Sequence, residues 1–154
     1  MIKSLKKNKT AHLKSKIINT LMINGRKTAG EKILLKSLKS LQKSTDKNFK
    51  TLLHSAIVNL ASAFKVSEQA VKKGKRKTVK SIPSFIISDS LRITTALKLL
   101  TKTSMKIKSS NFLYKKLVGE ILSSSVLKGQ TIDRKNEIQR QILVNKRYLS
   151  KFRW

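Results

Sequence analysis

The sequence predicts a mainly α fold, a bundle of about six helices with a protruding basic two-stranded β-ribbon arm. Apolar side chains recur at three- and four-residue intervals through most of the chain, which is typical of helices that bury one face. This spacing is lost between residues 65 and 88, where valines, isoleucines, Thr78 and Phe85 sit among cations. The 154 residues suffice for one hydrophobic core, and no linker or internal repeat divides them. We therefore expect one domain over residues 1–154, with the ribbon between the third and fourth helices.

The first three helices are expected before residue 61. Asn24-Gly25 is a stop signal after the first helix, and Thr28 with Glu31 has the spacing of a capping box that opens the second. Asp46 can cap the third. The predicted buried faces of these helices comprise Leu13, Ile17, Leu21, Met22, Leu34, Leu38, Leu41, Phe49, Leu52, Leu53, Ala56, Ile57 and Leu60.

Three more helices are expected after the ribbon. Asp89 or Ser90 can cap the fourth helix, and the fifth runs from about Ser110 until Gly129 ends it. The sixth is expected to start near Asp133. The predicted inward residues are Ile93, Ala96, Leu97, Leu100, Leu113, Leu117, Ile121, Ile138, Ile142 and Leu149.

The predicted ribbon carries a dense cationic segment, with six lysines and arginines among the nine positions from Lys72 to Lys80. Pro83, the single proline of the chain, cannot donate a backbone hydrogen bond, so the strand that holds it must be exposed along one edge. An isolated two-stranded ribbon is marginally stable in water. We therefore expect an arm that is mobile until an anionic partner holds it.

The net charge of +29, from 36 Lys and Arg against 7 Asp and Glu, indicates a polyanionic partner because such self-repulsion opposes a compact state. Lysine outnumbers arginine, and a lysine ammonium is a point charge suited to phosphate backbones. Residues 1–10 are interpreted as a basic N-terminal arm for nucleic acid, with a short organellar presequence as the alternative. The charge therefore favours nucleic-acid binding without distinguishing DNA from RNA.

The residues argue against catalysis. His12 and His54 lack partners at metal-ligand spacing, so a capping or solvent-facing role is expected for each, and cysteine is absent. Most acids fall at predicted helix starts, and Glu120 and Glu137 are expected to form ion pairs. No apolar run approaches the roughly 18 residues of a membrane span. We expect no enzyme activity, no cofactor, no metal and no membrane partner.

Particular stretches resemble the family of small-subunit ribosomal protein number seven. "NTLMINGRKTAGEKILLKSL" is similar to the family's LM-x-x-G-K-K turn and the helix that follows it. "GQTIDRKNEIQRQILVNKRYLSKFRW" resembles its C-terminal helix and its closing aromatic-Arg-Trp. The middle matches in layout, with a basic ribbon whose second strand contains Ile82-Pro83. The likeness covers nearly the whole chain, although Gly74 is the one glycine near the ribbon tip and Leu99 replaces a tryptophan usual in the family.

The resemblance implies a structural constituent of the small ribosomal subunit. By resemblance, the body binds the 3′ major domain of small-subunit rRNA and helps nucleate head assembly, and the arm reaches toward the exit-site tRNA and the mRNA. The implied protein neighbours are the small-subunit proteins numbered nine, eleven, thirteen and nineteen. Frequent Ile, Asn, Ser and Lys suggest an AT-rich organellar gene, so a mitochondrial, organelle-encoded ribosomal protein is expected.

The runner-up hypothesis is a DNA-compacting architectural protein, which needs similar charge and can also use a ribbon arm. Such proteins usually pair through an extended apolar face, and the sequence shows no spare apolar stripe, so we expect no homo-oligomer. The expected RNA-binding residues are Lys3, Lys6, Lys7, Lys9, Arg26, Lys27, Lys72, Lys73, Lys75, Arg76, Lys77, Lys80, Arg92, Lys102, Lys106, Lys108, Arg134, Lys135, Arg140, Lys146, Arg147, Arg153 and Trp154.

Overall fold

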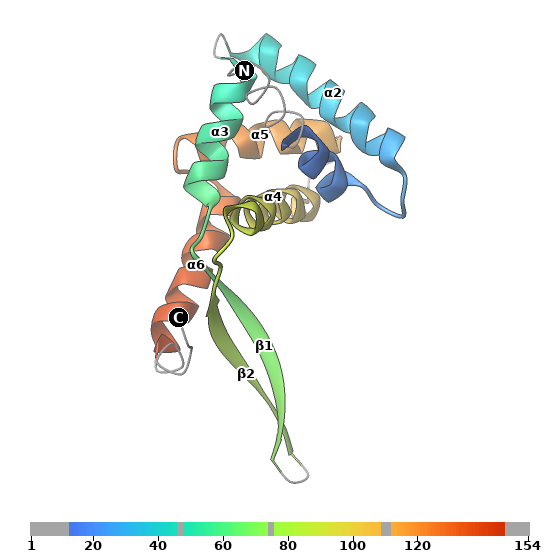
Figure 1. The fold of residues 1–154 in the computed structure, drawn as a ribbon. Coiled ribbons are helices and arrows are strands. Elements are labelled where there is room, and N and C mark those ends of the chain that lie inside the picture. Colours follow the sequence, from blue (N-terminus) through green and yellow to red (C-terminus); the bar gives the residue numbers. More distant parts are fainter. Residues whose placement is uncertain (1–12, 46–47, 74–75, 109–111, 147–154) are drawn as a thin grey trace, which may run out of the picture.

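A computed structural model describes residues 13–45, 48–73, 76–108 and 112–146 of the chain (Figure 1). The described part contains six helices and one two-stranded sheet, which confirms the predicted fold class. The first helix covers residues 13–21. The other elements, in chain order, are α2 (Lys27–Ser44), α3 (Phe49–Leu60), β1 (Phe64–Lys73), β2 (Arg76–Phe85), α4 (Asp89–Lys106), α5 (Leu113–Ser125) and α6 (Gln130–Val144).

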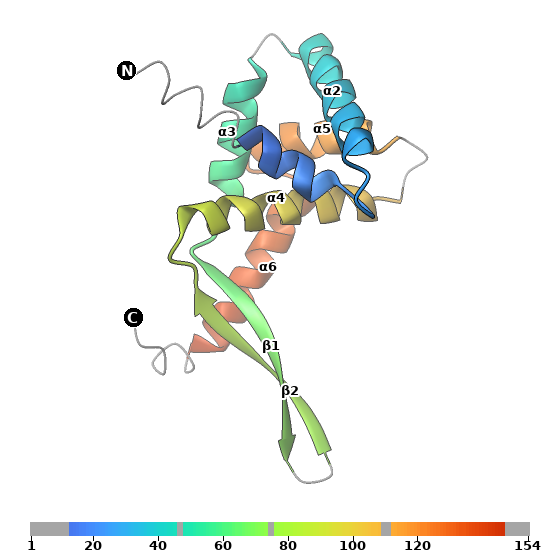
Figure 2. The ribbon, with the colours of Figure 1, turned by 45° about the vertical axis from the view of Figure 1, so that its right-hand side comes forward.

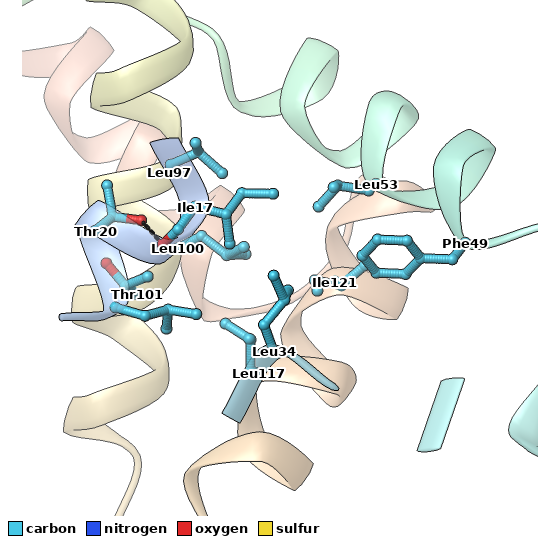
Figure 3. A pocket seen from close by; sticks show the side chains of 11 residues that line it. Ile17, Thr20, Leu34, Phe49, Leu53, Leu97, Leu100, Thr101, Leu117 and Ile121 are labelled. Carbon is cyan, nitrogen blue, oxygen red and sulfur yellow. Dashed lines mark hydrogen bonds between the residues drawn. The ribbon is translucent and has the colours of Figure 1, made fainter. Parts of the chain in front are cut away.

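Helix α5 lies at the centre of the helical body, where it packs against α2, α3 and α4. The apolar faces predicted from the helical spacing meet there, with Leu41, Leu97 and Ile121 almost completely buried. Figure 3 shows side chains from the first helix and from α2, α3, α4 and α5 converging on one small space in this core. The helical spacing in the sequence therefore identified most of the core, but it missed Ile18, Val118 and Ile132, which are also buried.

The predicted capping box of α2 is wrong. The helix begins at Lys27, with Arg26 in the N-cap position, and no side chain caps it. Asn24 and Gly25 both have positive φ, 52° and 73°, so the chain reverses at once and enters the helix before Thr28 can cap it. Thr28 and Glu31 thus lie inside the helix.

The caps of α3 and α4 also differ from the prediction. Asn48 caps α3, because its side chain accepts a hydrogen bond from the Lys50 backbone N–H at 3.3 Å, while Asp46 lies outside the described residues. Ser88 occupies the N-cap of α4 without a side-chain cap bond. Asp89 is the first residue of that helix, so neither it nor Ser90 caps it.

The boundary between α5 and α6 lies elsewhere than predicted. Helix α5 starts at Leu113, a few residues after the predicted start at Ser110, which lies outside the described residues, and it ends at Ser125. Gly129 instead holds the N-cap position of α6, with φ of 98°. Helix α6 therefore begins at Gln130, before Asp133, and it buries Ile132 and Ile142. Leu149 lies outside the described residues.

The ribbon is an antiparallel pair that projects from the helical body beside α6 (Figures 1 and 2). Its register pairs Phe64 with Phe85 at the base and Lys73 with Arg76 near the tip. The Ile86 N–H donates to the Ala63 carbonyl oxygen at 2.8 Å, and hydrogen-bonded pairs alternate along such a ladder. Pro83, opposite Val66, therefore takes a position that requires no N–H, which explains how the strand tolerates it.

Candidate nucleic-acid interface

Acidic side chains neutralise few of the cations. Within the described ranges, two ion pairs occur, Arg92 with Asp89 at 3.6 Å and Arg134 with Glu137 at 3.0 Å. The second confirms the ion pair expected for Glu137. Glu120 forms no ion pair among the described residues; it is buried and accepts hydrogen bonds from the backbone N–H and the hydroxyl of Thr131. That expectation was wrong because the start of α6 supplies Glu120 with two donors.

The cations predicted on the helical body form two separate groups. Arg26 and Lys27 are exposed at the start of α2, which lies on the opposite side of the body from α6 (Figures 1 and 2). The other group spans α4 and α6 and the residues that follow them. Its exposed members are Lys102, Lys106, Lys108, Arg134, Arg140 and Lys146.

The end of α4 and the start of α6 bring part of the second group together. Lys106 and Arg134 line one shallow depression, together with the acids Asp133 and Glu137. Lys102 and Lys135 line a second, larger groove. Cations of α4 and α6 that are about 30 residues apart in the sequence thus line the same depressions.

The ribbon places cations opposite cations. The register pairs Lys72 with Lys77 and Lys73 with Arg76, and it pairs Lys80 with Gln69. Like charges at facing positions of an antiparallel pair are destabilising. An anionic partner along the ribbon would relieve this repulsion, which supports the interpretation of the ribbon as a phosphate-binding arm.

Besides Arg134, which pairs with Glu137, two of the predicted RNA contacts are engaged within the fold. Arg92 donates from Nε to the Ile86 carbonyl oxygen at 2.9 Å, so it holds the chain where the ribbon joins α4. The Lys135 ammonium donates to the Asn59 carbonyl oxygen at 2.5 Å, where it adds positive charge to the C-terminal end of α3. The helical spacing indicates neither contact, because Ile86 lies in the loop before α4 and Asn59 lies on a different helix from Lys135.

Some predicted contacts lie outside the described residues. They are Lys3, Lys6, Lys7, Lys9, Lys75, Arg147, Arg153 and Trp154. Their roles stay predictions, as does the interpretation of residues 1–10 as a basic arm.

Sequence reasoning missed the groove at the base of the ribbon. It has a volume of about 410 Å³ and lies between β1, α4 and α6. Its apolar lining includes Phe64, Val66, Leu99 and Ile138, and four lysines surround it, namely Lys65, Lys98, Lys102 and Lys135. The helical spacing could not reveal it, because the three walls come from distant parts of the chain.

No group of three or more potential metal-ligating side chains occurs among the residues with described positions. Over the same residues, no helix has the length and apolar character needed to cross a bilayer. His54 is exposed on α3, and His12 lies outside the described residues. The features that the described structure does supply are exposed cations on a helical body and an extended ribbon whose sequence is rich in lysine and arginine.

A basic helical body that carries a cationic ribbon is typical of proteins that bind nucleic acid. Residues 2–146 match the family model described as ribosomal protein S7p/S5e, and the chain belongs to this family. The resemblance seen in the sequence is thereby confirmed, and the family is one of structural proteins of the small ribosomal subunit.

Relatives from several organisms carry related names. The chain is 27% identical to the small ribosomal subunit protein uS7c of Tetradesmus obliquus, over 86% of this chain and 76% of the relative. It is 25% identical to uS7 of Baumannia cicadellinicola, over 91% of this chain and 85% of the relative. It is 28% identical to uS7c of Euglena longa, over 90% of this chain and 77% of the relative. These matches favour a ribosomal protein over the DNA-compacting alternative.

Proposed function

We propose that this chain binds the 3′ major domain of small-subunit rRNA, helps to nucleate assembly of the head, and extends its ribbon toward the exit-site tRNA and the mRNA. The observation that carries the proposal is the division of the molecule into a packed helical body and a projecting cationic ribbon (Figure 1). A body with its own core can bind folded RNA as a rigid unit. A ribbon that needs neutralisation suits a second, more distant phosphate backbone.

The charge distribution supports a backbone-binding mechanism. Exposed lysines dominate the described cations, and a lysine ammonium contacts phosphate as a point charge without reading base edges. Each phosphate that is neutralised releases counterions, so affinity is expected to fall as salt rises. The family's structural, non-enzymatic role fits this picture, in which affinity comes from many weak ionic contacts.

We further propose a mitochondrial ribosome as the site of action, with the small-subunit proteins numbered nine, eleven, thirteen and nineteen as neighbours. The frequent use of Lys, Ile, Asn and Ser supports an organellar gene. Relatives named uS7c are compatible with an organellar lineage, and bacterial relatives match equally well. Co-sedimentation of the protein with small subunits from purified mitochondria in high salt tests this placement, and sole recovery with plastid subunits would contradict it.

Two variants, each with several substitutions, test whether the ribbon and the body contribute differently to RNA binding. The ribbon variant replaces with Gln the six residues Lys72, Lys73, Lys75, Arg76, Lys77 and Lys80, and the body variant replaces Arg26, Lys27, Arg134 and Arg140. Binding of each to a 3′ major domain RNA fragment is measured across a salt series. The ribbon variant should bind with modestly lower affinity. The slope of its log affinity against log salt concentration should become less steep by about 0.7–0.9 for each phosphate that the ribbon no longer neutralises. The affinity of the body variant should fall further.

The functional readouts separate the two variants further. The ribbon variant should still assemble into small subunits and show its defect in the handling of exit-site tRNA or mRNA. Loss of all RNA binding by the ribbon variant, with wild-type affinity in the body variant, would overturn this division. Absence of RNA binding by the unmodified protein at low salt would overturn the proposed function itself.

A further inference from the structure

The groove at the base of the ribbon combines an apolar floor with a cationic rim. Phe64 and Val66 contribute from β1, Leu99 from α4 and Ile138 from α6, and all four side chains are half-buried. The volume of about 410 Å³ lies within the range of sites that hold small molecules, roughly 300–1,000 Å³. An apolar recess of this size on so charged a surface is suited to a flat, uncharged group that is attached to an anion.

The charges around the groove favour a nucleotide as its occupant. Lys65, Lys98 and Lys102 are exposed at the rim, and they come from two of the three walls. The rim continues directly into the ribbon, whose strands carry the densest cationic segment of the chain. An RNA backbone that follows the ribbon toward the body therefore arrives at the groove with its phosphates next to these lysines.

Glu68 is an acid in this cationic setting. It is exposed, lines the groove and forms no ion pair among the described residues. An ionised glutamate accepts hydrogen bonds through two oxygens and donates none. Guanine presents two adjacent N–H donors, N1–H and the N2 amino group, on its Watson–Crick edge. A single carboxylate can therefore accept both, whereas adenine, cytosine and uracil do not offer that pair.

We propose that the groove binds one unstacked nucleobase of the RNA, with guanine preferred, an inference that rests on the proposed function. The base lies against the apolar floor, the flanking phosphates contact Lys98 and Lys102, and the Glu68 carboxylate accepts from the base edge. Specific RNA recognition commonly uses bases that have left the helical stack. An acidic protein segment is the competing occupant, but it would bring its own carboxylates toward Glu68.

The test compares two short RNA duplexes that differ by one bulged guanosine. The full-length protein should bind the bulged duplex roughly tenfold more tightly than the fully paired one, because an unpaired base can enter the groove and a paired base cannot. Leu99→Trp places a larger side chain in the groove, so it should abolish this preference while the affinity for the paired duplex stays unchanged. Circular dichroism confirms that the Leu99→Trp variant keeps its helices.

Glu68→Gln tests base selection without altering the apolar floor. The unmodified protein should prefer a bulged guanosine to a bulged uridine, and Glu68→Gln should reduce that preference severalfold. Lys98→Gln is the matched control, because it should weaken binding to both bulged duplexes equally. A photoactive 6-thioguanosine at the bulge should cross-link to β1, α4 or α6.

The outcomes distinguish the inference from the function on which it rests. Equal affinity for the paired and bulged duplexes, or cross-links confined to other elements, would overturn the nucleobase site and leave RNA binding intact. The groove would then be available to an acidic protein segment. Failure to bind either duplex at low salt would instead count against the proposed function.

Discussion

The Arg92 guanidinium lies over the ring of Phe85, with its central carbon 5.3 Å from the ring centroid. Phe85 ends β2 and also meets Phe64, at the start of β1, in an edge-to-face contact with centroids 5.4 Å apart. Because Arg92 also donates to the Ile86 carbonyl oxygen, it holds the base of the ribbon to α4. A second contact holds the ribbon to the end of α6. Halfway along the ribbon, the Asn145 side-chain amide donates a hydrogen bond to the Ser81 hydroxyl at 3.0 Å.

Arg92→Gln should loosen the base of the ribbon and leave the helical core folded. The change removes the cation–π contact and the hydrogen bond to Ile86, so we expect a loss of roughly 1–2 kcal/mol in local stability. Faster hydrogen exchange at the Ile86 amide, which bonds to Ala63, is the direct measurement. Arg140→Gln, at an exposed position of α6, is the control. Unchanged exchange at Ile86 would show that Arg92 does not hold the ribbon.

Glu120→Ala should destabilise the protein by roughly 1–3 kcal/mol, because it leaves two buried donors of Thr131 without their acceptor. The Thr131 hydroxyl lies 2.6 Å from that of Thr103, so the substitution also affects the packing of α6 against α4. Urea unfolding measures the change. Glu137→Ala breaks a half-exposed ion pair and should cost less than about 1 kcal/mol. Equal effects of the two substitutions would contradict the capping role of Glu120.

Two glycines should respond to alanine in opposite directions. Gly129 has φ of 98°, and an added Cβ would lie 2.8 Å from the Ser123 Cβ, so Gly129→Ala should cost more than about 1 kcal/mol. Gly119 lies within α5 with no atom near the added Cβ, so Gly119→Ala should stabilise the protein by roughly 0.5–1 kcal/mol. Thermal unfolding measures both. A stabilising Gly129→Ala would contradict the described turn.

Hydrogen exchange should differ between the body and the ribbon in the free protein. Helices α3 and α5 pack against each other and bury much of the core, so their central amides should exchange slowly. In the far half of the ribbon, cations lie opposite one another and α6 gives no support. The backbone amides there should therefore exchange quickly. Added RNA should slow the ribbon amides selectively. Equal protection of ribbon and body in the free protein would contradict this expectation.

Local patterns in the sequence were sufficient to specify the helical faces and the ribbon. The buried apolar residues of α4, Ala96, Leu97 and Leu100, follow the helical spacing, because that spacing is a local property of the chain. The loss of helical spacing near residue 65, together with Pro83, was enough to predict where in the chain the ribbon lies. The excess of cations likewise indicated a nucleic-acid partner before any contact was known.

How the helices begin and end, and what the cations do, depends on the packing between elements. Glu120 caps α6 from another helix, and Lys135 reaches the Asn59 carbonyl oxygen across 76 residues of sequence. Such partners depend on which elements pack together, so no local pattern encodes them. The groove arises for the same reason, since its walls come from β1, α4 and α6, which meet only in the folded chain. Spacing along a chain specifies which side of a helix is apolar, whereas packing between elements determines which polar groups meet.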